Sequence, residues 1–276
     1  MPGKIPSHPT LQPAQILVAL VLYRCKLADA ASWQSLGGLE SPAHFFIWDN
    51  SPEGQEMPDT ARIDYVHCPE NLGVSAAYNA ASRQARALGI PWLLLADQDT
   101  SFPEGALSNV PIHERYAIMA WPACDALGQI SPFLFRWGRG WRVRDLPPGR
   151  CSLRKYRLIN SGLLVTTKLF EEAGGYNEQL PLDFSDIEFL ERAGKQASHF
   201  LLLSPATQHR LSGSAHQPPE QALIRFRHYA TGALRFGTLT ARKCQMASNV
   251  LIRAIVQSLR YGNVKFLRIA LAAYTE

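Results

Sequence analysis

Short apolar runs alternate with amphipathic segments along the first hundred positions. Four of these runs predict buried strands, at residues 15–23, 44–50, 62–68 and 92–97. Residues 71–89 keep apolar side chains at helical spacing until Gly89 and Pro91, and residues 27–36 predict a shorter helix. Strands that alternate with helices in this way favour a parallel sheet with crossover helices.

The second half of the chain predicts further strands and helices in a less regular order. Strands are expected at residues 116–121, 131–137, 159–166 and 199–204, and helices at residues 168–175 and 183–194. Two or three helices are expected over residues 217–274, the last of them at 249–274. This last helix is apolar with interspersed Arg and Lys residues, a pattern that suits docking on a bilayer surface and equally suits packing on the core.

The length and composition fit one large α/β domain. With 276 residues, of which 46% are hydrophobic, the chain can bury a sizeable core. We expect a loose N-terminal arm at residues 1–14, the main domain at 15–215 and a basic helical extension at 216–276. No secretory signal or spanning segment is predicted, because the first apolar run is far shorter than the roughly 20 residues that cross a bilayer. Five scattered cysteines without a CxxC pair indicate a reducing cytoplasm.

The net charge of +5 is unevenly distributed. From Glu220 onward nine basic residues oppose two acidic ones, and in residues 136–157 eight basic residues oppose Asp145 alone. Such asymmetry indicates an anionic partner, which could be a membrane surface, a phosphate-bearing substrate or nucleic acid. For either segment alone, a solvated basic face is an equally good interpretation.

Carboxylates follow the predicted strands at one edge of the sheet. Ligands of open parallel sheets bind beyond the carboxyl ends of the strands, where Tyr23, Asp49 and the pair Asp97 and Asp99 are expected. Two aspartates two positions apart can share Mg²⁺ or Mn²⁺. The alternative is that they cap a helix that begins in residues 100–107.

A second acidic segment and a histidine lie further along the chain. Asp183, Asp186 and Glu188 fall at a helix start among apolar residues, so a partly buried carboxylate could serve as a general base, although anions at a helix start also stabilise the helix dipole. His209 follows a short apolar strand and is either a structural residue or a metal ligand. Asn160 and Ser161 form a polar turn ahead of another strand.

Taken in order, these stretches resemble the inverting glycosyltransferases of family 2, and among them the bacterial rhamnosyltransferases. The matching stretches are WDNSPEG, NLGVSAAYNAA, LLLADQDTSFP, INSGLLVTTKLFEEAGGYNEQLPLDFSDIEFLER and QHRLSG, which span roughly residues 15–215. The resemblance implies a glycosyltransferase-A, Rossmann-like fold, with a mainly parallel mixed central sheet flanked by helices and a C-terminal helical region. Residues 15–215 would then be the catalytic domain.

The resemblance also implies roles for individual residues. The donor nucleotide sugar is expected at Tyr23, Asp49, Asn71, Gly73, Asn79, Asp97, Gln98, Asn160 and Ser161. Asp97, Asp99 and His209 are expected to hold Mg²⁺ or Mn²⁺. Asp186 matches the catalytic base, and Glu188 is expected to orient the acceptor or the base, whereas Asp183 has no role that carries over.

The implied reaction is a single displacement that moves a sugar from a nucleoside diphosphate to a saccharide or lipid-linked acceptor with inversion. The sequence DQD favours L-rhamnose from dTDP-L-rhamnose, with UDP-galactofuranose, UDP-glucose or UDP-N-acetylglucosamine as alternatives. The resemblance implies a role in the synthesis of bacterial cell-surface polysaccharides. We expect the protein in the cytoplasm, with its basic C-terminal helices in contact with the inner membrane. Residues 136–157 match nothing in the family and form either an acceptor loop or a hairpin with a solvated basic surface.

Two other classes of protein fit the sequence less well. A nucleotidyltransferase needs a glycine-rich basic loop after the first strand, and residues 23–33 contain no glycine. A non-catalytic module that binds nucleic acid or a membrane through its basic segments would leave the ordered carboxylates unexplained. We therefore expect an enzyme, with no nucleic-acid partner.

Overall fold

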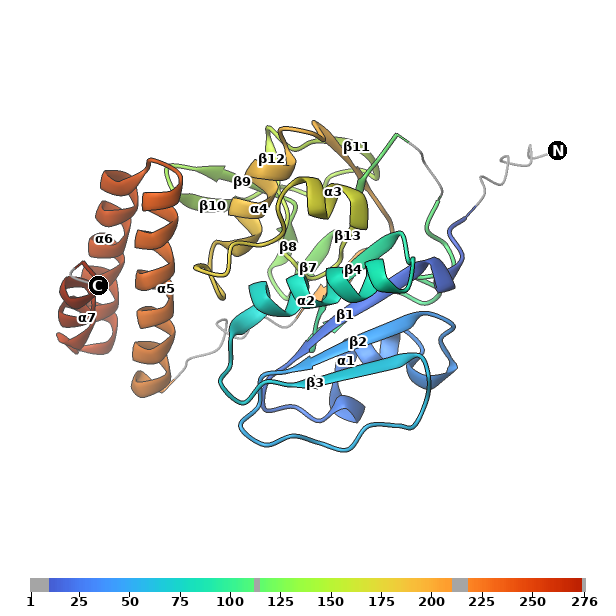
Figure 1. The fold of residues 1–276 in the computed structure, drawn as a ribbon. Helices are drawn as coiled ribbons and strands as arrows, with labels where there is room; N and C mark the ends of the chain where they lie inside the picture. Colours follow the sequence, from blue (N-terminus) through green and yellow to red (C-terminus); the bar gives the residue numbers. More distant parts are fainter. Residues whose placement is uncertain (1–9, 112–114, 210–217, 275–276) are drawn as a thin grey trace.

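A mixed eight-stranded sheet forms the centre of the protein (Figure 1). The computed structural model describes residues 10–111, 115–209 and 218–274. The strand order is β11-β14-β6-β13-β4-β1-β2-β3. In that order the strands are Gly149–Ser152, His199–Leu202, Ile118–Ala120, Leu163–Thr166, Trp92–Asp97, Ile16–Leu22, His44–Asp49 and Ile63–His67.

The directions of the strands confirm the expected mainly parallel mixed sheet. Neighbours among β4, β1, β2 and β3 pair in parallel, and β14 pairs with β6 in parallel. The antiparallel strand β13 lies between β4 and β6, and β11 is antiparallel to β14 at the edge. The four parallel strands are the ones that the alternating first half of the sequence predicts.

Helices cover both faces of the sheet. The helices α2 (Gly73–Ala87), α3 (Thr167–Glu172) and α4 (Ser185–Ala193) pack on one face, and α1 (Ala31–Ser35) packs on the other. Alternate residues of β1 enter the two cores, so the whole strand is buried. Three single-turn helices lie at Pro13–Gln15, Leu27–Asp29 and Gly38–Glu40.

Two smaller sheets lie beside the central one. The first contains β10 (Arg139–Arg142), β9 (Phe133–Arg136) and β12 (Tyr156–Arg157), so the basic segment includes a β9–β10 hairpin. The second contains β5 (Thr100–Ser101), β15 (Thr207–His209), β7 (Ala123–Asp125) and β8 (Gly128–Ser131). The helix considered at residues 100–107 is absent, because this stretch begins as β5 and continues in turns. The capping interpretation of Asp97 and Asp99 is therefore wrong.

Three helices form the C-terminal region: α5 (Pro219–Leu239), α6 (Lys243–Tyr261) and α7 (Lys265–Ala273). The expected single helix over 249–274 is wrong, because Gly262 adopts a positive φ of 60° and ends α6. The three helices share one core, which Phe133, Leu180 and Ile187 join to the main domain. Residues 210–217, which connect the two regions, lie outside the described residues, as do 275–276.

The start of the chain and the cysteines complete the fold. Residues 1–9 of the expected loose arm lie outside the described residues, but Leu11 is buried and its N–H donates to the carbonyl of Val110. The described part of the arm is therefore packed on the domain. All five cysteines are free thiols. In the described chain no helix combines the length and the apolar character that a bilayer crossing requires.

Candidate functional site

The carboxyl ends of β1, β2 and β4 meet at one edge of the central sheet. In the parallel register Leu22 lies opposite Asp49, and Val21 lies opposite Asp97. Tyr23 follows directly after β1. The fold therefore brings Tyr23, Asp49 and Asp97 together, as the order of the strands predicts.

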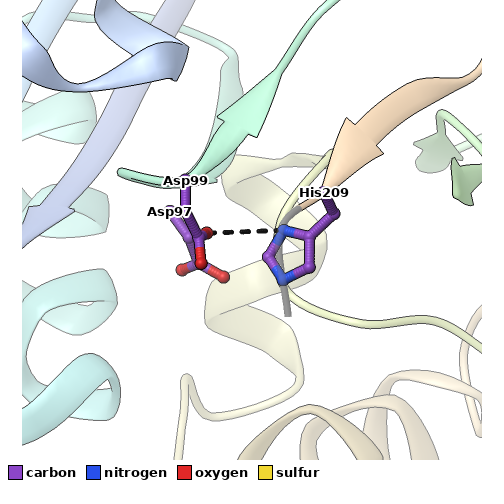
Figure 2. A group of neighbouring side chains, drawn as sticks. All are labelled: Asp97, Asp99 and His209. Atoms are coloured by element: carbon purple, nitrogen blue, oxygen red, sulfur yellow. Dashed lines mark ion pairs between the residues drawn. The ribbon is translucent and has the colours of Figure 1, made fainter. Parts of the chain in front are cut away.

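Asp97, Asp99 and His209 form a group that could hold a metal ion (Figure 2). One ligand atom from each residue lies within 4.8 Å of the other two. Asp97 ends β4, whereas His209 arrives on β15, whose antiparallel pairing with β5 places His209 opposite Thr100. The Nδ1 atom of His209 is 3.4 Å from Oδ1 of Asp99.

The chemistry of this group fits a divalent cation. Oδ1 of Asp99 is buried and accepts no hydrogen bond from the described residues, which is rare for a carboxylate oxygen. Burial, with a smaller contribution from the charge of Asp99, raises the pKa of Asp97 to about 6, against the opposing effects of His209 and Tyr78. Burial likewise raises the pKa of Asp99. Two carboxylates and an imidazole that face one another are a ligand set suited to Mg²⁺ or Mn²⁺.

Hydrogen bonds hold the three side chains in place. The N–H of Asp97 donates to Oγ of Ser161, and the Ser161 hydroxyl donates to Oγ1 of Thr100 at 2.7 Å. Thr100 Oγ1 in turn lies 2.6 Å from Nδ1 of His209, which orients the ring. The hydroxyl of the buried Tyr78 donates to Oδ1 of Asp97 at 3.1 Å. Ser161 therefore holds both Asp97 and Thr100, and through Thr100 it helps to position His209.

Asp49 is enclosed by donors from the protein itself. Its side chain is fully buried, one oxygen accepts from the N–H of Ser51, and the other accepts from Nε2 of Gln55 and the hydroxyl of Tyr65. Burial alone would raise the pKa of Asp49, but the hydrogen bonds from Ser51, Gln55 and Tyr65 outweigh it and lower this pKa. In the described structure Asp49 shapes the loop after β2.

Gln98 connects the ends of β1 and β4. Its side-chain oxygen accepts from the N–H of Tyr23 at 2.8 Å, and its Nε2 donates to the carbonyl of Tyr23 at 3.2 Å. Because both ends of the amide are used, Gln98 holds the partly exposed Tyr23 at the sheet edge.

The segment at the start of α2 contacts the loop that leads to α4. Asn71 is exposed and has a positive φ of 52°. Gly73 has a φ of 84°, and a Cβ atom there would lie 2.2 Å from the carbonyl oxygen of Pro181, so only glycine fits. Asn79 donates to the carbonyl of Tyr176 and accepts from its N–H. Gly73 begins α2, Asn71 lies two residues before it, and Gly73 and Asn79 fasten the helix to residues 176–181.

Asn160 belongs to the same network of contacts. Its side-chain oxygen accepts from the hydroxyl of Tyr176 at 2.7 Å, and its Nδ2 lies 3.5 Å from Oγ of Ser185. Tyr176 also packs edge-on against Tyr78 and stacks on Phe189. These contacts connect the metal group to the start of α4.

Asp186 lies on the first turn of α4 and lines a groove of about 530 Å³. Burial raises its pKa to about 7, with additions from the charges of Asp183 and Asp97 and an opposing hydrogen bond from the N–H of Ile187. The rest of the lining is mainly aromatic, apolar and cationic, with one further acidic residue, Asp183, and one amide, Asn249: Phe133, Phe135, Gly138, Arg139, Gly140, Asp183, Phe184, Ile187, Tyr229, Asn249, Ile252, Arg253 and Val256.

The other two acidic residues of this segment are paired with arginines. Glu188 is buried and accepts two hydrogen bonds from Arg192, at 2.7 and 2.6 Å. Two residues along a helix correspond to about 200°, so Glu188 leaves α4 on the side opposite Asp186. Asp183 accepts two hydrogen bonds from Arg225 of α5. Asp186 alone of the three has no cationic partner among the described residues.

The structure adds residues that the sequence interpretation did not assign to the site. Thr100 and Tyr78 hold the metal group, Tyr176 connects it to α4, and Arg225 fastens the C-terminal helices to the loop before α4. Tyr78 gave one usable signal, because a tyrosine on the buried face of a helix needs a partner for its hydroxyl. Arg225 lies 42 residues from Asp183, so only the fold reveals that pair.

Comparisons with known proteins identify the fold. No protein-family model and no curated protein matches the chain. Among solved structures it is similar to TarS of S. aureus, with 16% identity and a TM-score of 0.50 over 79% of this chain and 39% of that one. A second TarS structure, of residues 1–349, has 14% identity and a TM-score of 0.50 over 79% of this chain and 65% of that one. GalNAc-T7 with UDP, GalNAc and Mn²⁺ has 13% identity and a TM-score of 0.49, over 78% and 50%.

The chain has the glycosyltransferase-A fold. The expectation of this fold from the sequence is confirmed. At 14–16% identity the fold is what the TarS matches show, and the chain spans 39% and 65% of the two TarS chains.

Proposed function

We propose that this protein is an inverting glycosyltransferase of family 2 that transfers a sugar from a nucleoside diphosphate with the aid of a divalent cation. The observation that carries the proposal is the group of Asp97, Asp99 and His209 at the carboxyl edge of the sheet, in which Oδ1 of Asp99 accepts no hydrogen bond from the described residues. The glycosyltransferase-A fold, and a second, weakly acidic carboxyl group at Asp186, support it.

The residues divide into two sets with different tasks. Asp97, Asp99 and His209 would hold Mg²⁺ or Mn²⁺, and the bound cation would supply Lewis-acid stabilisation of the diphosphate leaving group. Asp186 accepts the proton of the attacking acceptor hydroxyl, and the groove beside it receives the acceptor. One displacement with inversion needs one base, which matches the single unpaired carboxylate of α4. Glu188 acts indirectly, through the hydrogen bonds that it accepts from Arg192.

The remaining predicted donor residues form the frame of the donor site. Tyr23 is held by Gln98 and is partly exposed, so its ring, over which the Arg24 guanidinium lies at 5.3 Å, is accessible to a nucleotide. Asp49, Asn71, Gly73, Asn79, Asn160 and Ser161 position the surrounding loops. For the donor we favour dTDP-L-rhamnose over UDP-sugars, on the resemblance of DQD to rhamnosyltransferases. The acceptor is a saccharide or a lipid-linked saccharide of cell-surface polysaccharide synthesis, on the cytoplasmic face of the membrane.

A thermal-shift panel tests the proposal. The purified protein is heated with dTDP-rhamnose, UDP-glucose, UDP-galactofuranose or UDP-N-acetylglucosamine, each with Mn²⁺, with Mg²⁺ and with EDTA. A ligand at a hundredfold excess over its dissociation constant adds about 2.7 kcal/mol to the apparent stability, so the correct donor raises the Tm. The shift is expected only with metal and is expected to vanish in Asp99→Asn. If no nucleotide sugar gives a metal-dependent shift, the proposal is wrong.

A further inference from the structure

Helix α6 exposes a row of large aliphatic side chains, which we name the α6 apolar face. Its members are 42–79% exposed: Leu251, Ile252, Ile255, Val256 and Leu259. At about 100° per residue they span an arc of about 140° on one side of the helix. The opposite side of α6 carries Met246, Val250 and Ala254, which are buried in the C-terminal core. Helix α6 therefore has two apolar sides, of which one is packed in the core and the other is exposed.

The α6 apolar face is continuous with the groove beside Asp186. Ile252 and Val256 are members of the face and also line that groove. The β9–β10 hairpin closes the groove next to α6, because Asn249 of α6 accepts from Nε of Arg139 and donates to the carbonyl of Trp137. A molecule that extends out of the groove past Ile252 and Val256 therefore reaches the α6 apolar face.

The charges around the face favour an anionic partner. Arg253 and Arg260 fall on one flank of the row, at the adjoining helical positions. Between Glu220 and Glu276 the sequence contains no acidic residue and nine basic ones. Two of the nine have acidic partners elsewhere, since Arg225 pairs with Asp183 and Arg242 with Glu191.

We propose that α6 lies on an anionic lipid bilayer and that the groove beside Asp186 takes the head group of an acceptor anchored in that bilayer. An apolar row flanked by arginines is the pattern of a helix that lies in the membrane interface. A second copy of the chain is a poorer occupant, because a two-fold contact through this face brings like-charged arginine flanks together. The inference rests on the proposed function for the identity of the head group as acceptor.

The groove defines the class of acceptor. Its wall combines aromatic rings, including Phe135 and Tyr229, with the cationic groups of Arg139 and Arg253. The guanidinium of Arg253 lies 4.0 Å above the ring of Tyr229, which fixes it at the side of the groove. Rings and guanidinium groups together suit a sugar that carries a phosphate or diphosphate, and Ile252 and Val256 continue the path for its apolar anchor.

Vesicle sedimentation tests the membrane contact. The full-length protein is mixed with vesicles of phosphatidylcholine alone or with one third phosphatidylglycerol, and binding is expected only to the anionic vesicles, weakening as salt rises. Ile255→Glu and Leu259→Glu, which lie outside the groove, are each expected to weaken this binding by about tenfold or more, because each replaces an aliphatic side chain that would be buried in the interface with a charged one. Arg260→Gln is expected to weaken it by about fivefold, or 1 kcal/mol.

Leu127→Glu is the matched control. Leu127 is 81% exposed and Leu259 is 79% exposed, but Leu127 lies in the β7–β8 turn. The control is expected to bind vesicles as the unaltered chain does. Equal binding of Leu259→Glu and the unaltered chain overturns the inference. So does a dimer in solution that Leu259→Glu abolishes, or tighter binding to nucleic acid than to anionic vesicles.

Donor binding separates this inference from the proposed function. Leu259→Glu is expected to keep the metal-dependent thermal shift with the nucleotide sugar while it loses vesicle binding. A chain that shows the shift but never binds vesicles leaves the proposed function standing and overturns the membrane contact. If vesicles are bound and no donor is, the membrane contact stands and the assignment of the groove to an acceptor is overturned.

Discussion

Asp49 at the end of β2 is fully buried and Asp186 at the start of α4 is partly buried, and their acidities change in opposite directions. Asp49 accepts hydrogen bonds from Ser51, Gln55 and Tyr65, and these outweigh burial and lower its pKa. Asp186 accepts from the N–H of Ile187, and burial raises its pKa to about 7. Burial alone therefore does not distinguish a reactive carboxylate, and the number of donors around it does.

This difference separates structure from chemistry in the proposed site. A carboxylate saturated with donors is stable as an anion and poor at taking a proton. A carboxylate that has few donors and a pKa near 7 can take a proton and release it again, as a general base must. Asp99 resembles Asp186 in this respect, since its Oδ1 accepts no hydrogen bond from the described residues, and a cation would give this oxygen a ligand contact.

The largest effect is expected from Asp186→Asn. The amide cannot accept the acceptor proton, so turnover is expected to fall by about 10²–10⁴-fold. Nucleoside diphosphate release measures turnover, and the thermal shift with donor and metal is expected to be unchanged. Near-full turnover in this variant would show that Asp186 is not the base.

Asp99→Asn is expected to reduce turnover by about 10²–10³-fold, the usual effect of removing one group that stabilises transition-state charge. Here the donor shift with Mn²⁺ is expected to disappear as well, because the ligand set loses a charge. Titration with Mn²⁺ measures the change, and partial rescue at high Mn²⁺ is expected. A variant with unaltered Mn²⁺ dependence would remove Asp99 from the metal site.

The pH dependence of turnover is the next largest effect. With a pKa of about 7, Asp186 is protonated and inactive below that pH, so turnover is expected to rise about tenfold per pH unit up to pH 7 and then to level. Residual turnover in Asp186→Asn is expected to lack this rise. A native profile that is flat between pH 5 and 7 would contradict the assignment.

The contribution of Asp186 to the free energy of unfolding is expected to fall as pH rises, whereas turnover is expected to rise. A raised pKa means that the folded state favours the protonated form, so this contribution is complete below the ordinary value of 3.8 and is lost as pH rises through about 7. Urea denaturation is therefore expected to show that Asp186→Asn gains stability relative to the unaltered chain between pH 4 and 8.

Asp49→Asn is expected to give the smallest effect on turnover and a clear loss of stability. An amide NH₂ cannot accept from Gln55 and Tyr65, and an unsatisfied buried donor costs about 1–3 kcal/mol of unfolding free energy. Because its pKa is lowered, the stability from Asp49 is present above pH 3.8 and is lost as pH falls through the folded value. Urea denaturation at pH 7 and pH 3 measures both. Unchanged stability at pH 7 would contradict the structural role of Asp49.

Local patterns were sufficient for much of the fold. The four parallel strands and α2 have strong periodicity, and all five lie where the sequence predicts them. The single helix expected at 249–274 failed, because an isolated glycine inside an apolar run permits either a continuous helix or a break. Here Gly262 takes the left-handed conformation, and α7 turns back on α5 and α6 to complete their core.

The sequence by itself determined which residues could carry chemistry, since Asp97, Asp99, His209 and the acidic segment at 183–188 follow from residue type and position relative to predicted elements, and the family resemblance selects Asp186 within that segment. It also determined the α/β class. Only the tertiary structure decided which of them meet. Strand β15 pairs with β5, so that His209 lies opposite Thr100, 109 residues away in the sequence, and close to Asp99. Because β5 takes the place of the expected helix, the capping interpretation is wrong.

The tertiary structure also decided which carboxylates are free. Glu188, Asp183 and Asp49 look as reactive in the sequence as Asp186 does, but Arg192, Arg225 and Tyr65 occupy their oxygens. The pKa of a carboxyl group depends on the donors and charges within a few ångströms, most of which come from distant parts of the chain. A linear pattern carries no record of those neighbours, and the folded chain does.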